Sequence, residues 1–344
     1  MNLTPEDILI LQSIVGDERV RTDADSLAVY GRDWTRVFSP APAAVVFPGS
    51  AEQVQALVLR AQERRWALVP SGGRTGLSGA AVAERGEIVV SFDRMNRILD
   101  FIAEDRMVKV EAGVVTQQLQ AYASERGLYY PVDFASAGSS QMGGNIGTNA
   151  GGIKVIRYGM TRDWVMGLKV VTGRGDILEL NGGMIKNATG YDLRHLFIGA
   201  EGTLGFVVEA TIALERAPRD LRVMVLGVPD FAAVMPLLQA FREQIELSAF
   251  EFFSELALQL GSSVPACRDP SPAVRRFMSS SSSKASMPAR SRQPSICSAP
   301  RSSMAGSSMG CSARARPRLS SFGVCVKTFR KRWRRTPPTR MTSR

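Results

Sequence analysis

The chain has 344 residues, a formal net charge of +11 and 44% hydrophobic residues. It contains no run of about eighteen apolar residues such as a membrane-spanning helix needs, and residues 1–7 lack the basic start of a secretory signal peptide. We therefore expect a cytoplasmic protein with one folded domain and part of another, and the sequence leaves open a peripheral attachment at the inner face of the membrane.

A glycine-rich stretch follows the first clear strand signal. The apolar run Trp66–Val69 predicts a buried strand, and Pro70–Gly79 after it combines glycines with small hydroxyl residues. A second stretch, Gly143–Gly152, has the same character. Glycine lets the backbone turn tightly and bring bare N–H groups close to a ligand, so the pair predicts a pyrophosphate cradle. Mobile surface loops are the alternative for either stretch alone.

Neither stretch fits the common nucleotide-binding motifs. No Gly-x-Gly-x-x-Gly lies between a strand and an amphipathic helix with an acidic residue some twenty positions on, which excludes the Rossmann fingerprint. No Gly-Lys-Ser/Thr closes either loop, which excludes the Walker pattern. The cradle must therefore belong to another class of nucleotide-binding fold.

A strand–helix–strand unit follows in the last third of the chain. Residues 222–228 and 248–253 predict strands, and residues 231–245 predict an amphipathic helix capped by Asp230. The sheet of this unit is unfinished, because two strands and one helix leave apolar faces and edges in water.

The composition changes abruptly at about Leu260. Residues 1–259 hold 25 Lys and Arg against 31 Asp and Glu, whereas residues 260–344 hold 18 against the single acid Asp269. The basic run Arg330–Arg335, with Trp333 as a stacking face, is the kind of segment that contacts phosphates. A disordered arm that binds RNA or anionic lipid is one reading of this tail. All cysteines also lie in it, without any Cys-x-x-Cys pair, so we expect reduced thiols and no zinc site: Cys267, Cys297, Cys311 and Cys325.

The genetic code favours a different origin for the tail. If each codon is read as the third base of one printed codon and the first two of the next, permitted synonymous choices over residues 277–284 encode YVLVEFE, an alternating strand. From Phe322 the same frame can encode WRLREDISETLA, and the last residues can encode YKNDIS, in which Met341 followed by Thr342 forces the Asp. We therefore interpret residues 260–344 as out-of-frame translation, which predicts a disordered basic tail with no nucleic-acid partner.

An ordered series of segments resembles the flavoprotein superfamily of vanillyl-alcohol oxidase and p-cresol methylhydroxylase. Within it, the chain is most similar to the FAD-linked 2-hydroxy-acid dehydrogenases: the glycolate oxidase flavin subunit, D-lactate dehydrogenase and D-2-hydroxyglutarate dehydrogenase. The segments that carry the likeness cover nearly all of residues 1–259: Tyr30–Trp34, Val45–Pro48, Pro70–Gly79, Val110–Gly113, Tyr130–Asp133, Gly138–Gly152, Tyr158–Gly159, Lys186–Leu193 and Ile198–Gly205.

The resemblance implies an α+β fold in three parts. Residues 1–218 would form a two-subdomain FAD-binding domain of the p-cresol methylhydroxylase type. Residues 219–259 would begin a ferredoxin-like substrate domain, left incomplete, and residues 260–344 would be the disordered tail.

The resemblance also implies a set of cofactor-binding residues. The diphosphate would lie against Ser71, Gly72, Gly73, Arg74, Thr75, Gly76, Leu77 and Ser78. The flavin and ribityl side would meet Gly138, Ser139, Gly143, Gly144, Asn145 and Thr148, and the nucleotide half would meet Glu201, Gly202 and Val207. Further cofactor contacts would come from Pro131, Asp133, Asn149, Gly151 and Gly152. Where some relatives attach the flavin through a histidine, this chain has Arg74, so we expect non-covalent FAD.

The catalytic residues stay unassigned. In the family, FAD takes a hydride from C2 of a 2-hydroxy acid, aided by a base and often by a divalent metal held by histidines in the C-terminal half. This chain has one histidine, His195, for which a structural or surface role is favoured. One histidine cannot build a multi-histidine site, so we expect the family's metal site to be missing.

Three functional hypotheses stay open. The first is an FAD-binding fragment of a 2-hydroxy-acid dehydrogenase with impaired catalysis. The second is a working flavoprotein subunit completed by a partner chain or by a second copy. The third is a nucleic-acid or membrane adaptor that acts through the basic tail. The residues indicate neither which hydroxy acid is the substrate nor the electron acceptor.

Overall fold

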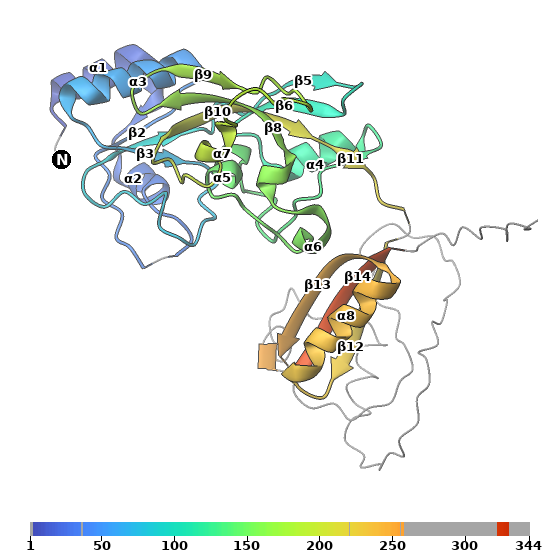
Figure 1. Cartoon of the computed structure of the whole chain (residues 1–344). Coiled ribbons are helices and arrows are strands. Elements are labelled where there is room, and N and C mark those ends of the chain that lie inside the picture. The colour runs from blue at the N-terminus through green and yellow to red at the C-terminus, as the bar shows by residue number, and fades with distance from the viewer. Residues whose placement is uncertain (1–2, 36, 220, 255, 258–321, 330–344) are drawn as a thin grey trace, which may run out of the picture. The chain divides into compact units, whose positions relative to one another are not determined.

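The computed structural model describes residues 3–35, 37–219, 221–254, 256–257 and 322–329 (Figure 1). The chain divides into two compact units. The first comprises Met1–Gly152 and Tyr158–Ala217, and the second comprises Ile153–Arg157 and Pro218–Arg344. Each unit is described by itself.

Short helices alternate with strands up to Ala217. The helices are α1 (Pro5–Val15), α2 (Ala24–Tyr30), α3 (Ala51–Arg64), α4 (Thr116–Ser124), α5 (Met142–Gly147), α6 (Val155–Tyr158) and α7 (Arg194–Phe197), with 3-10 turns η1 (Asp17–Arg19) and η2 (Thr161–Trp164). The strands are β1 (Val20–Arg21), β2 (Ala44–Val46), β3 (Leu68–Ser71), β4 (Ile88–Ser91), β5 (Ile98–Ile102), β6 (Met107–Glu111), β7 (Leu128–Tyr129), β8 (Val165–Thr172), β9 (Ile177–Leu180), β10 (Gly205–Ala213) and β11 (Glu215–Arg216).

The smaller of the two main sheets has the order β1-β2-β4-β3. Strands β2, β4 and β3 are parallel, with Val45 and Val69 both opposite Val89. The apolar side chains of β2 and β4 are buried as expected for a parallel sheet covered on its faces, whereas Leu68 and Val69 of β3 are only partly buried. The predicted strand at 66–69 is therefore present, although it starts two residues later and runs to Ser71, so the first glycine-rich loop leaves from the carboxyl end of a parallel strand.

The larger sheet is antiparallel and has the order β5-β6-β10-β8-β9. Strand β10 alternates strictly between buried and partly exposed residues, which is the period-two pattern of a strand with one face in a core.

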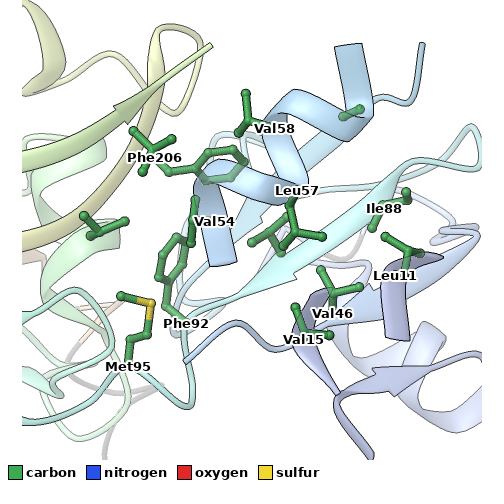
Figure 2. Packing of buried hydrophobic residues seen from close by; sticks show 14 of the residues in the cluster. Leu11, Val15, Val46, Val54, Leu57, Val58, Ile88, Phe92, Met95 and Phe206 are labelled. Carbon is green, nitrogen blue, oxygen red and sulfur yellow. The ribbon is translucent and has the colours of Figure 1, made fainter. Parts of the chain in front are cut away.

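Helix α3 connects the cores of the two sheets. Its N-terminus is capped by Ser50, whose hydroxyl accepts from the Gln53 N–H at 3.3 Å. Its apolar residues Val54, Leu57 and Val58 are almost fully buried and share one cluster with Ile88 of β4 and Phe206 of β10 (Figure 2). A second cluster packs α4 and α5 against β6, β8 and β10. This packing fixes α5, and with it the second glycine-rich stretch.

The second unit contains the predicted strand–helix–strand unit. Its elements are β12 (Arg222–Val228), η3 (Phe231–Ala233), α8 (Val234–Gln244), β13 (Glu246–Ser254) and β14 (Phe322–Phe329). The predicted cap is present, since the Asp230 carboxylate accepts from the Ala233 N–H at 3.0 Å. Val228, Val234 and Leu247 form its small buried core.

One part of the tail differs from the expectation of disorder. Strand β14 pairs antiparallel with both β12 and β13 and lies between them in the sheet. Strands β12 and β13 are not paired with each other, and residues 322–329 form the strand between them, paired with both. The rest of the predicted tail, including Cys267, Cys297, Cys311 and the basic run 330–335, lies outside the described residues.

Candidate functional site

A cleft of about 640 Å³ lies in the first unit, where three loops meet. The first loop is residues 72–79 after β3, the second surrounds α5, and the third precedes β10. The sequence predicts that the two glycine-rich stretches form one pyrophosphate-binding site, and the structure places residues of both stretches on this cleft.

Most of the predicted cofactor residues line the cleft. Those on its wall are Ser71, Gly72, Gly73, Arg74, Thr75, Gly76, Leu77, Ser78, Gly143, Gly144, Asn145, Thr148, Asn149, Gly151, Glu201, Gly202 and Val207. Those that are not part of the lining are Pro131, Asp133, Gly138, Ser139 and Gly152. One of these five, Ser139, supports the wall, because its carbonyl stands directly behind Gly73. Two others pack against each other, since a Cβ on Gly152 would collide with the Asp133 carbonyl oxygen.

The glycines of the cradle fall into two groups. A Cβ on Gly73 would collide with the backbone of Ser139, and one on Gly143 would meet the Ala112 side chain at 2.7 Å. Among the residues that the structure describes, a Cβ on Gly76 or Gly144 would meet no atom within 4 Å. Gly73 and Gly143 are therefore needed for close packing between loops, whereas Gly76 and Gly144 leave open space at the cleft.

The first loop presents free hydrogen-bond donors. Among the described residues, none of the backbone N–H groups of residues 72–78 donates to a protein acceptor, and the next one, at Gly79, donates to Asp33. Clustered unpaired N–H groups form an anion-binding concavity. The predicted diphosphate cradle therefore has the donors that it needs.

Asp33 fastens this loop to the N-terminal segment. The Asp33 side chain is buried and accepts from the Gly79 N–H at 2.8 Å and from both the N–H and the hydroxyl of Thr35. The Trp34 N–H also donates to the Gly76 carbonyl at 3.0 Å. The resemblance in sequence covers Tyr30–Trp34 but indicates no role for Asp33, because its partner Gly79 lies 46 residues away.

Arg74 is held by a cluster of side chains beneath the loop. Its backbone is left-handed, with φ of 57°, and its guanidinium lies 4.4 Å from the centre of the Tyr30 ring. Its Nη1 donates to the Gly72 carbonyl at 3.0 Å and lies 3.9 Å from an Asp93 carboxylate oxygen. The Tyr30 hydroxyl donates to Asp93 at 2.8 Å. Burial, and then the bond and charge of Asp93, raise the pKa of Tyr30.

The third loop is joined to the other two at Glu201. Its N–H donates to the Gly147 carbonyl at 2.8 Å, and its carboxylate accepts from the Ser78 hydroxyl at 3.1 Å. Glu201 has φ of 50°, so its backbone takes a left-handed conformation that few residues adopt. The three loops therefore form one connected wall.

His195 takes no part in the cleft. Its side chain is 44% exposed, with Nδ1 3.1 Å from an Arg162 guanidinium nitrogen and Nε2 3.5 Å from an Asp192 oxygen. Within the described part of the chain, no group of three or more His, Cys, Asp or Glu side chains is arranged to hold a metal ion. None of the described helices has the length and apolar character of a membrane span.

Two buried polar atoms on the cleft wall have no partner among the described residues. These are the hydroxyl oxygen of Ser71 and the Oε1 atom of Gln141. A dinucleotide such as FAD carries a diphosphate as well as hydroxyl and N–H groups. These groups could form hydrogen bonds with the two buried atoms and with the unpaired N–H groups of the first loop, in the space beside Gly76 and Gly144. The residues present fit that ligand. Gln141 was not among the predicted site residues, although it immediately precedes Met142 and Gly143.

Comparison with known proteins defines the class. Residues 42–181 match the model of an FAD binding domain family. The fold is that of alkyldihydroxyacetonephosphate synthase, at a TM-score of 0.74 and 20% identity over 95% of this chain and 56% of that one. It is also that of p-cresol methylhydroxylase, at a TM-score of 0.66 and 17% identity over 94% of this chain and 60% of that one. The chain therefore has the fold of p-cresol methylhydroxylase, as predicted, and residues 42–181 are similar to an FAD binding domain.

The amino-acid sequence is also similar to those of curated proteins. The chain is 68% identical over 248 residues to a D-2-hydroxyglutarate dehydrogenase of Stutzerimonas stutzeri, covering 72% of this chain and 53% of that protein. It is 55% identical over 257 residues to one from Xanthomonas citri, covering 75% and 54%. The chain is therefore similar in sequence to D-2-hydroxyglutarate dehydrogenases, and it spans about half the length of these relatives.

Proposed function

We propose that this chain binds FAD without a covalent bond, in the cleft between its three loops. The main support for this proposal is that, among the described residues, the backbone N–H groups of residues 72–78 have no protein acceptor and lie beside open space at Gly76 and Gly144. The first loop would hold the diphosphate, α5 and its neighbours the flavin side, and Glu201, Gly202 and Val207 the nucleotide half. Arg74 supports the absence of a covalent link, because a guanidinium cannot form the bond that a histidine forms.

The proposed reaction is oxidation of a 2-hydroxy acid to the 2-oxo acid. When bound, FAD supplies the hydride acceptor. The names of the most similar relatives favour D-2-hydroxyglutarate over D-lactate and glycolate as the substrate. The protein's own contribution in the described residues is to bind and orient the cofactor, and the family's metal and base would have to come from elsewhere.

We also propose that catalysis in this chain is impaired. The supporting observations are the change of composition at about Leu260 and the extent of the matches to the two relatives, which cover 248 and 257 residues. A partner chain or a second copy that completes the site is the alternative. An adaptor role of the basic tail is a third proposal, which would require salt-sensitive RNA binding that is lost on truncation after residue 259.

The test is reconstitution of the purified chain with FAD, followed by anaerobic addition of D-2-hydroxyglutarate, D-lactate and glycolate. Bound yellow flavin without bleaching supports the impaired fragment. Bleaching by one of the acids supports the alternative, a working flavoprotein whose site is completed by a second copy or a partner chain, and identifies its substrate. A chain that binds no FAD would overturn the proposed function.

A further inference from the structure

The Gln141 side chain has one polar atom that makes a hydrogen bond within the protein and one that has no hydrogen-bond partner among the described residues. Its side chain is only 7% exposed and lies on the cleft wall. Its Nε2 donates to the Asp93 carboxylate at 2.7 Å, whereas its Oε1 has no hydrogen-bond partner among the described residues. A buried unpaired acceptor costs about 1–3 kcal/mol of desolvation, so such an atom calls for an explanation.

Asp93 fixes which end of the amide faces the cleft. An ionised carboxylate has only acceptors, so the amide must turn its NH₂ group toward Asp93. The other Asp93 oxygen is already occupied, because it accepts from the Tyr30 hydroxyl at 2.8 Å. Rotation of the Gln141 amide would place two acceptors against each other. The carbonyl oxygen is therefore held away from Asp93.

That oxygen lies beside the first loop. A Cβ built on Gly72 would come within 3.5 Å of the Gln141 Oε1 atom. Gln141 also occupies the N-cap position of α5, where the Asn145 N–H donates to its carbonyl at 2.9 Å, and its backbone pairs with Val115. Both the backbone and the side chain are thus anchored, and the acceptor has a fixed position where two walls of the cleft meet.

We infer that Gln141 Oε1 accepts a hydrogen bond from a hydroxyl or N–H group of the bound cofactor. This inference rests on the proposed function. The diphosphate of FAD has only acceptors at neutral pH and cannot satisfy this atom, whereas the ribityl and ribose hydroxyls, the flavin N–H and the adenine amino group can. The free hydroxyl of Ser71, fully buried on the same wall, gives a second polar contact that can donate or accept.

The test is Gln141→Met, which keeps the length of the side chain and removes its acceptor. The matched control is Gln120→Met, because the Gln120 Nε2 also makes one donor bond, to the Val132 carbonyl at 3.0 Å, and Gln120 is not on the cleft. We expect Gln141→Met to raise the Kd for FAD about tenfold, as loss of one buried hydrogen bond does. Gln120→Met should leave the Kd unchanged.

The second readout is the melting temperature of the FAD-free chain. Both variants lose one donor bond, and Gln141→Met should destabilise the FAD-free chain more, because its bond goes to the Asp93 carboxylate whereas that of Gln120 goes to a neutral carbonyl. A merely structural role for Gln141 would also lower the melting temperature but would leave the Kd unchanged. If Gln141→Met fails to fold, Gln141→Asn keeps a polar amide while withdrawing the acceptor, and it should weaken FAD binding in the same way.

The outcomes separate this contact from the proposed function. Wild-type protein that binds FAD, with Gln141→Met binding equally well, overturns the contact alone. Equal weakening in Gln141→Met and Gln120→Met also overturns it. Wild-type protein that binds no FAD overturns the proposed function, and the contact falls with it.

Discussion

Arg74 lies over the ring of Tyr30, with its guanidinium carbon 4.4 Å from the ring centre. Asp93 lies beside both side chains, at 3.9 Å from the guanidinium and 2.8 Å from the phenol. The cation is therefore stacked and partly neutralised beneath the loop that presents the free N–H groups. This arrangement holds the loop in place when its donors have no ligand.

Arg74→Gln should weaken FAD binding and lower the free energy of unfolding by about 0.5–2 kcal/mol, the value of a partly desolvated cation–π contact. Arg126→Gln is the matched control, because Arg126 lies 3.4 Å from the centre of the Tyr122 ring and outside the cleft. Urea unfolding and FAD titration would measure both effects. If Arg126→Gln weakened FAD binding as much as Arg74→Gln, the role of Arg74 in the loop would be excluded.

The raised pKa of Tyr30 predicts a loss of stability at alkaline pH. Burial and Asp93 raise this pKa above its ordinary value of 10.0, so the folded protein keeps a proton that the unfolded chain releases. The contribution of Tyr30 to stability is complete below pH 10 and is lost as the pH rises through the folded-state pKa. Tyr30→Phe should therefore have a shallower decline of stability above pH 10 than the wild type.

The measurement is the free energy of unfolding of both proteins over the alkaline range. Burial also raises the pKa of Tyr130, so part of the decline should remain in Tyr30→Phe. Identical slopes in the two proteins would show that Tyr30 does not gain its proton affinity from the fold.

Two glycines of the first loop should respond differently to a methyl group. Gly73→Ala puts a Cβ into the Ser139 backbone, so we expect destabilisation by about 1–3 kcal/mol or more, as overpacking produces. Gly76→Ala adds a methyl group that has no atom of the described part of the chain within 4 Å, so the FAD-free chain should keep its stability. FAD affinity should nevertheless fall in Gly76→Ala, because the methyl group takes space at the cleft. Equal stability of the two variants would contradict this division.

The sequence predicted what depends on short stretches of chain. The strand–helix–strand unit at residues 222–253 follows from local periodicity and from the cap at Asp230, and the structure has all of it. The glycine-rich loops were likewise predicted as one cradle.

What the sequence did not predict depends on contacts between distant segments. Asp33 binds Gly79 across 46 residues, and Asp93 orients Gln141 across 48. No local pattern carries such pairings. Gly73 lines the cleft, and the Ser139 backbone also passes directly behind it, a contact that the sequence does not indicate.

The tail offers a prediction at the level of the gene. An acidic, family-like sequence ends at about Leu260 and a basic sequence rich in Ser, Arg and Pro begins there. One missing base would cause such a change at a single point, and with permitted synonymous codons the alternative frame can encode a strand, YVLVEFE, and the family-like string WRLRE in order. At Met341 and Thr342 that frame has no codon freedom, and it still gives the Asp that YKNDIS requires. An independent read of the DNA across codons 255–270 should therefore reveal one extra base, which joins the frame of residues 1–259 to the frame that can encode YVLVEFE and WRLRE. If the printed frame is found instead, residues 260–344 are the true product. The chain's dehydrogenase activity must then be shown directly, because no histidine of the described residues lies on the cleft.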